Sequence, residues 1–590
     1  MAQAITVRSH APALPRAAFP AVPVSLLEWC LLVVLMVAAP LLYLPIVMHN
    51  LPVAAGIDER NALEVIRRFH QGSLNPQFFQ YPTIYFYLVY LLALPLHYNN
   101  VNVMMVGRLF DLLLIGVIAY LVFMFCRDRL HSRIAGLIAA TFVLGSTVLS
   151  GTTYLHPDLL MTVAGTASLY YLVDYFETRS QRAWLLGLVF MGLSIGCKYT
   201  AFILFLGYAA TEVLESLRTR GRDTGRRGDV KRFSRTFCIS FLAIAGMVLM
   251  LSSWLLPLQS ILSALLRVRA LYQAGPGSYY VEVFGRLRRT LAELGLLSFA
   301  IALLCRFSRN VYESISIKRL YLGLGIILAI SVLCTPYSVL HPAQFIFDLG
   351  SLTRSNIVIA GGHLQWVSYA EWMVAEGALP VLVGFAGVAL FIKGRGRHFY
   401  VVAVYLAMYL YVLGSAHRGY IRYLAPVVPL LYCGAGIVIV HLWSSSGRTG
   451  TGAQSWGKGR LAAVLIIAAS PIQMIFNIVH NRQLARTNNS FYASYVAAKN
   501  ATTGTAYYVG WAPSIELEEA GIKTKELIWT RTPSGPLGDT LACGDTLTLN
   551  TPHSAKYDID APHDSSVVVM IDAPGDGLEE QEVLRRSACP

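Results

Sequence analysis

The chain has 590 residues, of which 14% are charged and 55% are hydrophobic. A soluble domain has roughly 25% charged residues, so this composition excludes a soluble enzyme. The net charge of +14 is unevenly placed: residues 1–480 carry 38 Lys or Arg against 19 Asp or Glu, and residues 481–590 carry 9 against 14. A basic membrane part with an acidic tail argues against nucleic-acid binding and favours contact with anionic membrane lipid.

Apolar stretches recur along most of the chain. A membrane helix needs about 20 such residues, and fewer where it packs inside a bundle. The sequence therefore predicts an all-α polytopic membrane protein with about thirteen transmembrane helices between residues 25 and 480. The predicted spans are residues 25–48, 103–126, 134–150, 158–176, 184–197, 199–217, 236–256, 290–305, 320–339, 374–392, 399–414, 424–441 and 461–479.

Basic loops predict the orientation, because such loops prefer the cytoplasm. The clearest is the segment 218–235, which holds eight Lys or Arg. It and the other basic loops agree if the N-terminal segment 1–24 is cytoplasmic and the tail, residues 481–590, lies outside. The segment 257–289 is an exception, since it is basic but falls outside. Two explanations stay open: long loops translocate regardless of charge, or these arginines meet phosphate or an anionic acceptor.

Residues 58–98 are predicted to lie on the outer face without crossing the membrane. Counting Pro82–Tyr98 as a span would place the basic loop 127–133 outside. The preceding segment 59–70 puts its apolar residues on one helical face, which indicates an amphipathic helix lying flat on the surface. These apolar residues are Ala62, Val65, Ile66 and Phe69.

The tail is predicted to be a small α/β unit, with a helix near 491–499 and strands near 506–511, 526–530 and 567–571. Cys543 and Cys589 are its only cysteines. Because disulfides persist outside the cytoplasm, these two are expected to pair.

Two groups of acids border the predicted outer face. Asp58 and Glu59 follow the first span directly, and His156 and Asp158 occupy the short outer turn between the third and fourth spans. Helix capping explains an isolated acid at such a place equally well, because Asp is a favoured N-cap and acids suit a first helical turn.

Three cations fall on the same predicted side: Lys198, Arg418 and Arg422. A lone lysine at a membrane boundary commonly snorkels to the interface. Gathered with carboxylates, however, cations provide what group transfer from a phosphate needs: a base for the incoming hydroxyl and positive charge for the departing phosphate.

The order of several short motifs resembles the phospholipid-carrier-dependent glycosyltransferases of the GT-C type, which include protein O-mannosyltransferases and the lipid A aminoarabinose transferase. The resemblance covers roughly residues 25–480. The motifs are Gly-Ile-Asp-Glu-Arg, Gln-Tyr-Pro-Thr-Ile-Tyr-Phe-Tyr, His-Pro-Asp-Leu-Leu, Gly-Leu-Ser-Ile-Gly-Cys-Lys-Tyr-Thr-Ala, Thr-Pro-Tyr-Ser-Val-Leu and Arg-Tyr-Leu-Ala-Pro-Val-Val-Pro.

The resemblance implies a polyprenyl-phosphate-linked sugar donor, an extracytoplasmic acceptor and a location in a bacterial inner membrane. It implies that Asp58 is the catalytic base, with Glu59 and Asp158 as further catalytic acids. Lys198 and Arg422 match positions at the phosphate end of the family's cavity. Arg418 is predicted to join them at the donor phosphate, and the residues predicted to line the cavity are Tyr81, His156, Tyr199 and Tyr337.

No nucleotide cofactor is expected, because the lipid already carries the activated sugar. A divalent metal stays open: the aminoarabinose transferase has a metal-binding Glu just upstream of this motif, where this chain offers Gln80.

Two other functions remain as alternatives. A transporter or flippase could bind an anionic lipid in the same cavity, and ionisable residues inside spans, such as Asp111, would favour that function. An oligosaccharyltransferase is the other alternative, against which the absence of a Trp-Trp-Asp run counts.

Overall fold

The protein is described from a computed structural model. The structure describes residues 26–219, 317–349 with gaps at 343 and 346–347, 366–414, 420–445, scattered positions between 461 and 479, 490–509, 514–526, 546–550, 565–571 and 581–586. Three predicted features, the spans 236–256 and 290–305 and the Cys543–Cys589 pair, lie outside the described residues.

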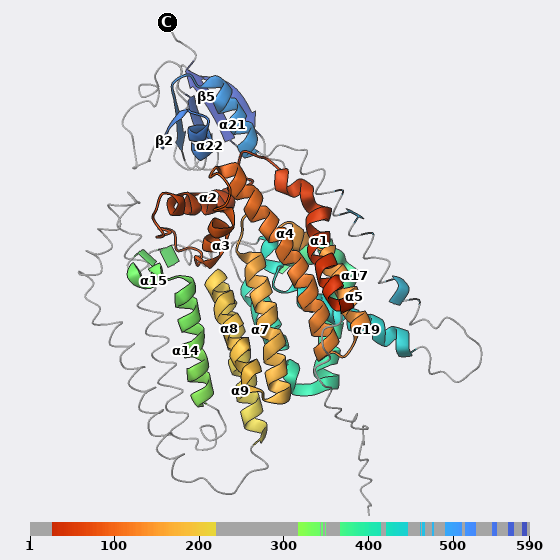
Figure 1. Ribbon diagram of the computed structural model, residues 1–590. Coiled ribbons are helices and arrows are strands. Elements are labelled where there is room, and N and C mark those ends of the chain that lie inside the picture. The colour runs from red at the N-terminus through yellow and green to blue at the C-terminus, as the bar shows by residue number, and fades with distance from the viewer. Residues whose placement is uncertain are drawn as a thin grey trace, which may run out of the picture.

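Helices dominate the described chain and run side by side as a bundle (Figure 1). In chain order they are α1 (Leu26–Met48), α2 (Ile57–His70), α3 (Ile84–Ala93), α4 (Asn100–Met124), α5 (Arg133–Leu144), α6 (Thr147–Ser150), α7 (Asp158–Thr178), α8 (Gln181–Cys197), α9 (Ile203–Thr219), α14 (Ile317–Cys334), α15 (Tyr337–Leu340), α17 (Trp366–Arg395), α18 (Tyr400–Gly414), α19 (Val428–Ser445), α21 (Ser490–Ala501) and α22 (Ser514–Glu519). Short π- or 3-10-helical turns are η1 (Phe125–Arg129), η2 (Tyr199–Phe202), η3 (Gly396–Phe399) and η4 (Ile421–Leu424).

Ten of the predicted spans correspond to described helices, from α1 to α19. Within the described ranges, two helical segments are long and apolar enough to cross a membrane, Asn100–Arg129 and Asp158–Thr178. A third would count if α17, which bends by 103° between Gly377 and Pro380, is one span. In the other apolar helices the counted segment has 10–17 residues, such as Val33–Met48 in α1, so among the described residues up to three spans meet both criteria.

Several close contacts between helices hold the bundle together. The pairs α7–α8, α1–α4 and α17–α19 are among the most extensive. At the α17–α19 crossing, a Cβ added to Gly384 would lie 2.4 Å from the carbonyl oxygen of Leu431. The two backbones therefore approach more closely than any larger residue would allow, which is typical of helices packed in a membrane.

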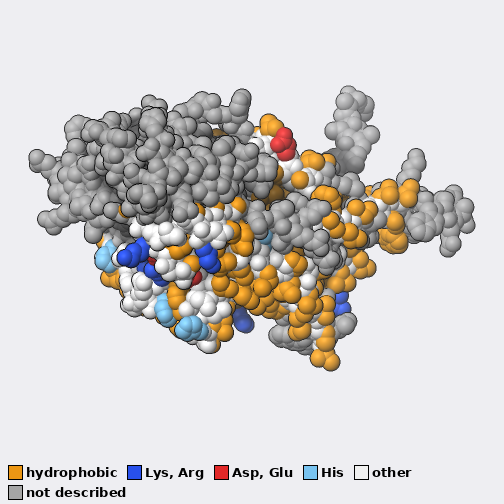
Figure 2. All heavy atoms as spheres, turned by 90° about the horizontal axis from the view of Figure 1, so that it is seen from above, with side chains coloured by type: hydrophobic (Ala, Val, Ile, Leu, Met, Phe, Trp, Pro, Cys, Tyr) orange, Lys and Arg blue, Asp and Glu red, His pale blue; other side chains and the backbone are white. Residues whose placement is uncertain are grey.

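The flanks of the bundle expose large apolar side chains, including Leu41, Leu109 and Ile134. Figure 2 shows hydrophobic side chains over much of the described surface, while Lys, Arg and His gather in one region of this face. An apolar flank of this extent suits contact with lipid tails.

The segment between α1 and α4 forms a separate layer at one end of the bundle (Figure 1). In α2 the four residues of the predicted apolar face, Ala62, Val65, Ile66 and Phe69, are all buried. They pack with residues of α3, among them Tyr85 and Val89. With only ten residues, α3 is too short to cross a membrane.

The tail forms a five-stranded sheet at the same end of the molecule (Figure 1). Its strands are β1 (Thr505–Val509), β2 (Lys523–Glu526), β3 (Thr546–Asn550), β4 (Ser565–Ile571) and β5 (Gln581–Arg586). The order is β2-β1-β3-β5-β4, with β1 parallel to β2 and β3, and with β5 antiparallel to β3 and β4. β3 and β5 were not expected from the sequence.

The tail contacts the loop that leads into α2. Val53 of this loop is buried with Tyr495, Ala498 and Leu517 of the tail. The Ala54 N–H donates to the Glu516 carboxylate at 3.3 Å. The tail therefore lies against the segment that carries the first predicted acid, Asp58.

Candidate active site

Asp58 is the second residue of α2. The helix has Gly56 as its N-cap, and that residue makes no side-chain capping bond. Asp58 lies inside the first turn, one residue beyond the start of the helix, so it is not at the N-cap position. Asp58 is therefore not needed to cap α2.

The Asp58 carboxylate bonds to two side chains that come from distant parts of the chain. Arg422 of η4 donates to Oδ2 at 2.5 Å, and the Tyr81 hydroxyl donates to Oδ1 at 3.1 Å. Burial alone would raise the pKa of Asp58, but Arg422 and then His156 lower it, and the pKa lies well below its usual range. Asp58 is thus an ionised group held by a cation.

Asp158 begins α7 and is fully buried. The turn before it is tight: Leu155 is buried with a positive φ of 49°, a conformation that a branched side chain rarely adopts. Leu155 fits because it packs against Gly107 of α4, where an added Cβ would lie 2.1 Å from its side chain. This packing fixes the direction in which His156 and Asp158 leave the turn.

Lys198 supplies the direct partner of Asp158. It lies just after α8 in an extended conformation, and its Nζ donates to Asp158 Oδ1 at 2.6 Å. Nζ also lies 4.1 Å from the ring centre of Tyr423 and 5.7 Å from that of Tyr81. Such rings stabilise a cation that has left water.

Arg422 lies between the two carboxylates. Its Nε is 3.8 Å from Asp158 Oδ2, and its guanidinium lies 4.2 Å from the centre of the Tyr420 ring. Sequence reasoning did not select Tyr420 or Tyr423. Their flanking positions in Gly-Tyr-Ile-Arg-Tyr are the signal that could have indicated an aromatic enclosure for Arg422.

His156 lies between the carboxylates as well. Its Nδ1 is 2.6 Å from Asp158 Oδ2, and its Nε2 is 3.7 Å from Asp58 Oδ2. Neither ring nitrogen has a partner in hydrogen-bond alignment among the described residues, although the side chain is 96% buried. The ring also packs edge-on against Tyr81, with 5.2 Å between centroids, so it is enclosed between the two carboxylates and that ring.

A second set of residues holds this cluster in position. The buried carboxylate of Asp111 in α4 accepts the Tyr85 hydroxyl at 3.0 Å and the His156 backbone N–H at 3.3 Å. Nothing in the sequence pairs Asp111 with the His156 turn, because 45 residues separate them.

The loop that carries Tyr81 is held on both sides. The Phe79 N–H donates to Asp348 at 2.7 Å, and the Phe79 carbonyl accepts the Tyr199 hydroxyl at 3.2 Å. Thr83 donates through its N–H to the Thr335 hydroxyl at 3.3 Å. The Tyr199 side chain thus supports this loop by bonding to the loop's backbone.

Three of the predicted site residues that the structure describes are not in the cluster: Tyr199, which supports the Tyr81 loop, Glu59 and Tyr337. Glu59 points away and forms a buried ion pair with Arg108, in which both guanidinium contacts measure 2.8 Å. The ring of Tyr337 stacks on His341 with 5.9 Å between centroids. Arg418 lies outside the described residues.

As the site is described, Arg422 and Lys198 are the partners of the two carboxylates. No group of three or more His, Cys, Asp or Glu suited to a metal was found among the described residues.

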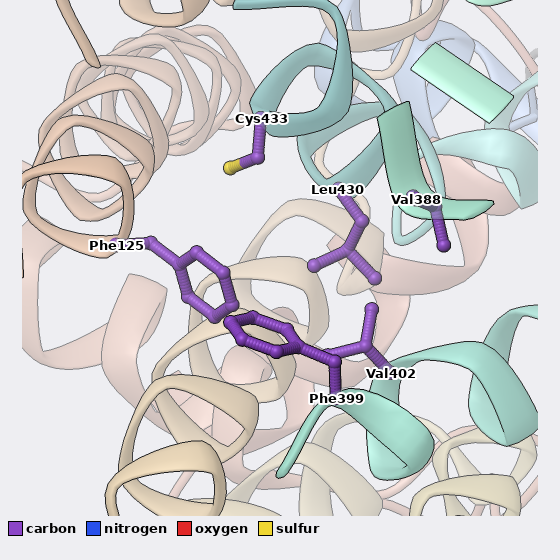
Figure 3. Close-up of a pocket in the computed structure, with 6 residues that line it drawn as sticks. All are labelled: Phe125, Val388, Phe399, Val402, Leu430 and Cys433. Carbon is purple, nitrogen blue, oxygen red and sulfur yellow. The ribbon is translucent and has the colours of Figure 1, made fainter. Parts of the chain in front are cut away.

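A small pocket elsewhere has a different character. Phe125, Val388, Phe399, Val402, Leu430 and Cys433 line it (Figure 3). Phe125 directly follows α4, and the other five come from α17, η3, α18 and α19, so none of the six belongs to the charged cluster. This pocket is separate from the charged cluster.

The cluster thus places two paired carboxylates beside two paired cations, on a predominantly helical bundle with apolar flanks. The model of the dolichyl-phosphate-mannose-protein mannosyltransferase family matches residues 82–222. This segment includes His156, Asp158 and Lys198. Over this part of the chain the sequence is similar to that family. A comparison with curated protein sequences found no match.

Solved structures give two further likenesses. The oligosaccharyltransferase AglB from Archaeoglobus fulgidus, in complex with an inhibitory peptide and a dolichol-phosphate, is 12% identical, with 85% of this chain and 64% of that chain covered and a TM-score of 0.49. ArnT from Cupriavidus metallidurans bound to undecaprenyl phosphate is 13% identical, with 95% and 98% covered and a TM-score of 0.49. The chain thus spans somewhat less than two thirds of AglB. At these identities and scores the likeness assigns no substrate or residue role.

Proposed function

We propose that the chain transfers a sugar from a polyprenyl-phosphate donor to an acceptor outside the cytoplasm, with inversion at the sugar carbon. The observation that carries this proposal is the charged cluster of Asp58, Asp158, Lys198 and Arg422. The family match supports a lipid-phosphate donor, because its description names a dolichyl-phosphate-linked sugar.

The charges of the cluster suit a lipid phosphate. The formal charges of the two carboxylates and the two cations cancel, so a bound phosphate needs at least one cation that can turn toward it. Arg422 and Lys198 both carry N–H groups that can donate hydrogen bonds to phosphate oxygens. The Arg guanidinium is planar and can donate two parallel bonds, whereas the Lys ammonium acts as a compact charge.

In the transfer step, Asp58 takes the proton of the acceptor hydroxyl. The hydroxyl oxygen forms a bond to the sugar C1 as the bond from C1 to the phosphate oxygen breaks. The electron pair of that bond leaves with the lipid phosphate, whose added charge Lys198 and Arg422 stabilise. The acceptor is a hydroxyl of a protein, lipid or glycan.

The cell location proposed with this function is a bacterial inner membrane, with residues 1–24 in the cytoplasm and the tail, residues 481–590, outside. The basic segment 218–235 supports this orientation. The cluster and the tail would then share the outer side, where the acceptor is found.

Asp58→Asn tests the catalytic role. The purified full-length protein is given a radiolabelled polyprenyl-phosphate sugar, and the transferred or released sugar is counted. Because Asn cannot accept the proton, turnover should fall by about 10²- to 10⁴-fold, the usual contribution of a positioned base. Near-normal turnover of a stable Asp58→Asn protein would remove Asp58 as the base.

The same measurement separates a transferase from a transporter or flippase of an anionic lipid. A transporter would bind the lipid but leave the sugar–phosphate bond intact. Wild-type protein that binds the donor and releases no sugar, across a panel of sugars and acceptors, would favour transport.

A further inference from the structure

Both cations of the cluster are already engaged by carboxylates. Arg422 holds Asp58 at 2.5 Å, and Lys198 holds Asp158 at 2.6 Å. A donor phosphate cannot bind either cation fully unless a carboxylate gives way, because a carboxylate and a phosphate oxygen would compete for the same N–H donors.

The two ion pairs differ in their access to solvent. The side chains of Asp58 and Arg422 are each 20% exposed, whereas Asp158 is 0% and Lys198 is 8% exposed. The first pair is therefore open to an incoming ligand, and the second is enclosed. Breaking an enclosed pair is also more costly, since it leaves an uncompensated buried charge.

Asp58 has a second partner that can keep it in place. The Tyr81 hydroxyl donates to Oδ1 at 3.1 Å, on the carboxylate oxygen that Arg422 does not hold. If Arg422 turned away, Asp58 would still be anchored by Tyr81 with its other oxygen free.

We infer that the donor phosphate replaces Asp58 on Arg422, so that binding of the donor itself releases the catalytic base. This exchange rests on the proposed function. Asp158 keeps Lys198 in position throughout, so Asp158 is a positioning residue and Asp58 the exchangeable one. No covalent bond changes in the exchange, only the partner of the guanidinium.

The exchange explains how a strongly paired carboxylate can serve as a base. Arg422 lowers the pKa of Asp58 in the site as described, and a carboxylate with a low pKa is a poor proton acceptor. Moving Arg422 to the phosphate removes that stabilisation and raises the basicity of Asp58 while the donor is bound. Without a donor the base stays inactive.

The test measures binding of a sugar-free polyprenyl phosphate to the full-length protein in detergent, with inorganic phosphate as a parallel ligand. Asp58→Asn removes the competing charge, so the lipid phosphate should bind about 5- to 30-fold more tightly, equivalent to about 1–2 kcal/mol. Asp58→Ala is the second variant, with the same expected direction. Inorganic phosphate should show a shift in the same direction, because the exchange occurs at the phosphate itself.

Glu64→Gln is the matched control. Glu64 lies on α2 as well and pairs with Arg68 on the surface, so its loss should leave lipid-phosphate binding unchanged. Arg422→Gln should weaken binding in every background.

Unchanged or weaker binding by both folded Asp58 variants would overturn the exchange. That result leaves the proposed function standing if Asp58→Asn has lost turnover. The proposed function has its own test, which it fails if wild-type protein transfers no sugar. The binding test uses a lipid phosphate without sugar, so its outcome does not depend on transfer.

Discussion

Glu59→Gln tests whether the second acid of α2 acts in catalysis or in structure. The Glu59–Arg108 pair is almost completely buried, with 1% and 0% of the side chains exposed. Arg108 also donates to the carbonyl oxygens of Val47 and His49 at 3.1 and 2.6 Å. The guanidinium therefore ties the end of α1 to the start of α2.

The expected loss follows from the buried charge. Gln keeps the volume of Glu and one acceptor, but it leaves Arg108 charged, buried and without a counterion. Removing one partner of a buried pair costs about 3–5 kcal/mol. The melting temperature should then drop on the order of 3–10 °C, depending on the size of the cooperative unit.

The assay is thermal unfolding of the purified protein in detergent, followed by tryptophan fluorescence. Glu64→Gln on the same helix is the control, since a partly exposed pair contributes about 0–1 kcal/mol. The double variant Glu59→Gln, Arg108→Gln should lose less than the sum of the single losses, because the two residues interact directly. A normal melting temperature together with lost turnover would refute this structural role and return Glu59 to catalysis.

Two further predictions concern pH and orientation. Burial raises the pKa of Asp348 to about 6, so its contribution to stability is present below pH 4 and lost as the pH rises through 6. Asp348→Asn should flatten the melting temperature against pH over that window, and an unchanged slope would exclude Asp348 as the cause. A reporter enzyme fused after Val479 should be active outside the cytoplasm, and activity inside would exclude the proposed orientation.

The sequence predicted much of what lies near the cluster. The helical period predicted that Ala62 and Ile66 lie on the buried face of α2. The predicted topology, together with the order of the short motifs, put Asp58, Asp158 and Lys198 on the same side of the membrane. These signals are local. The buried face of a helix can be predicted from that helix alone, and each motif marks the end of a predicted helix. Distant residues meet because those ends are gathered at one face.

Other features could not be predicted from local pattern. The Glu59–Arg108 pair needs the register of α4 against α2, across 49 residues. The support of Phe79 by Asp348 joins segments 269 residues apart. The bend of α17 at Gly377, which has a φ of 134°, falls inside one predicted span, because hydropathy does not distinguish a straight apolar helix from a broken one.

The ends of the helices explain why the charges of the cluster fall where they do. Asp58 lies in the first turn of α2 and Asp158 begins α7, so both carboxylates are at helix N-termini, where the helix dipole favours negative charge. Lys198 directly follows the C-terminus of α8, where the dipole favours a cation. Arg422 belongs to the short 3-10 turn η4, which offers no comparable dipole. Of the four charges it is therefore the least fixed by backbone electrostatics, and it is the one best suited to change partners when a phosphate arrives.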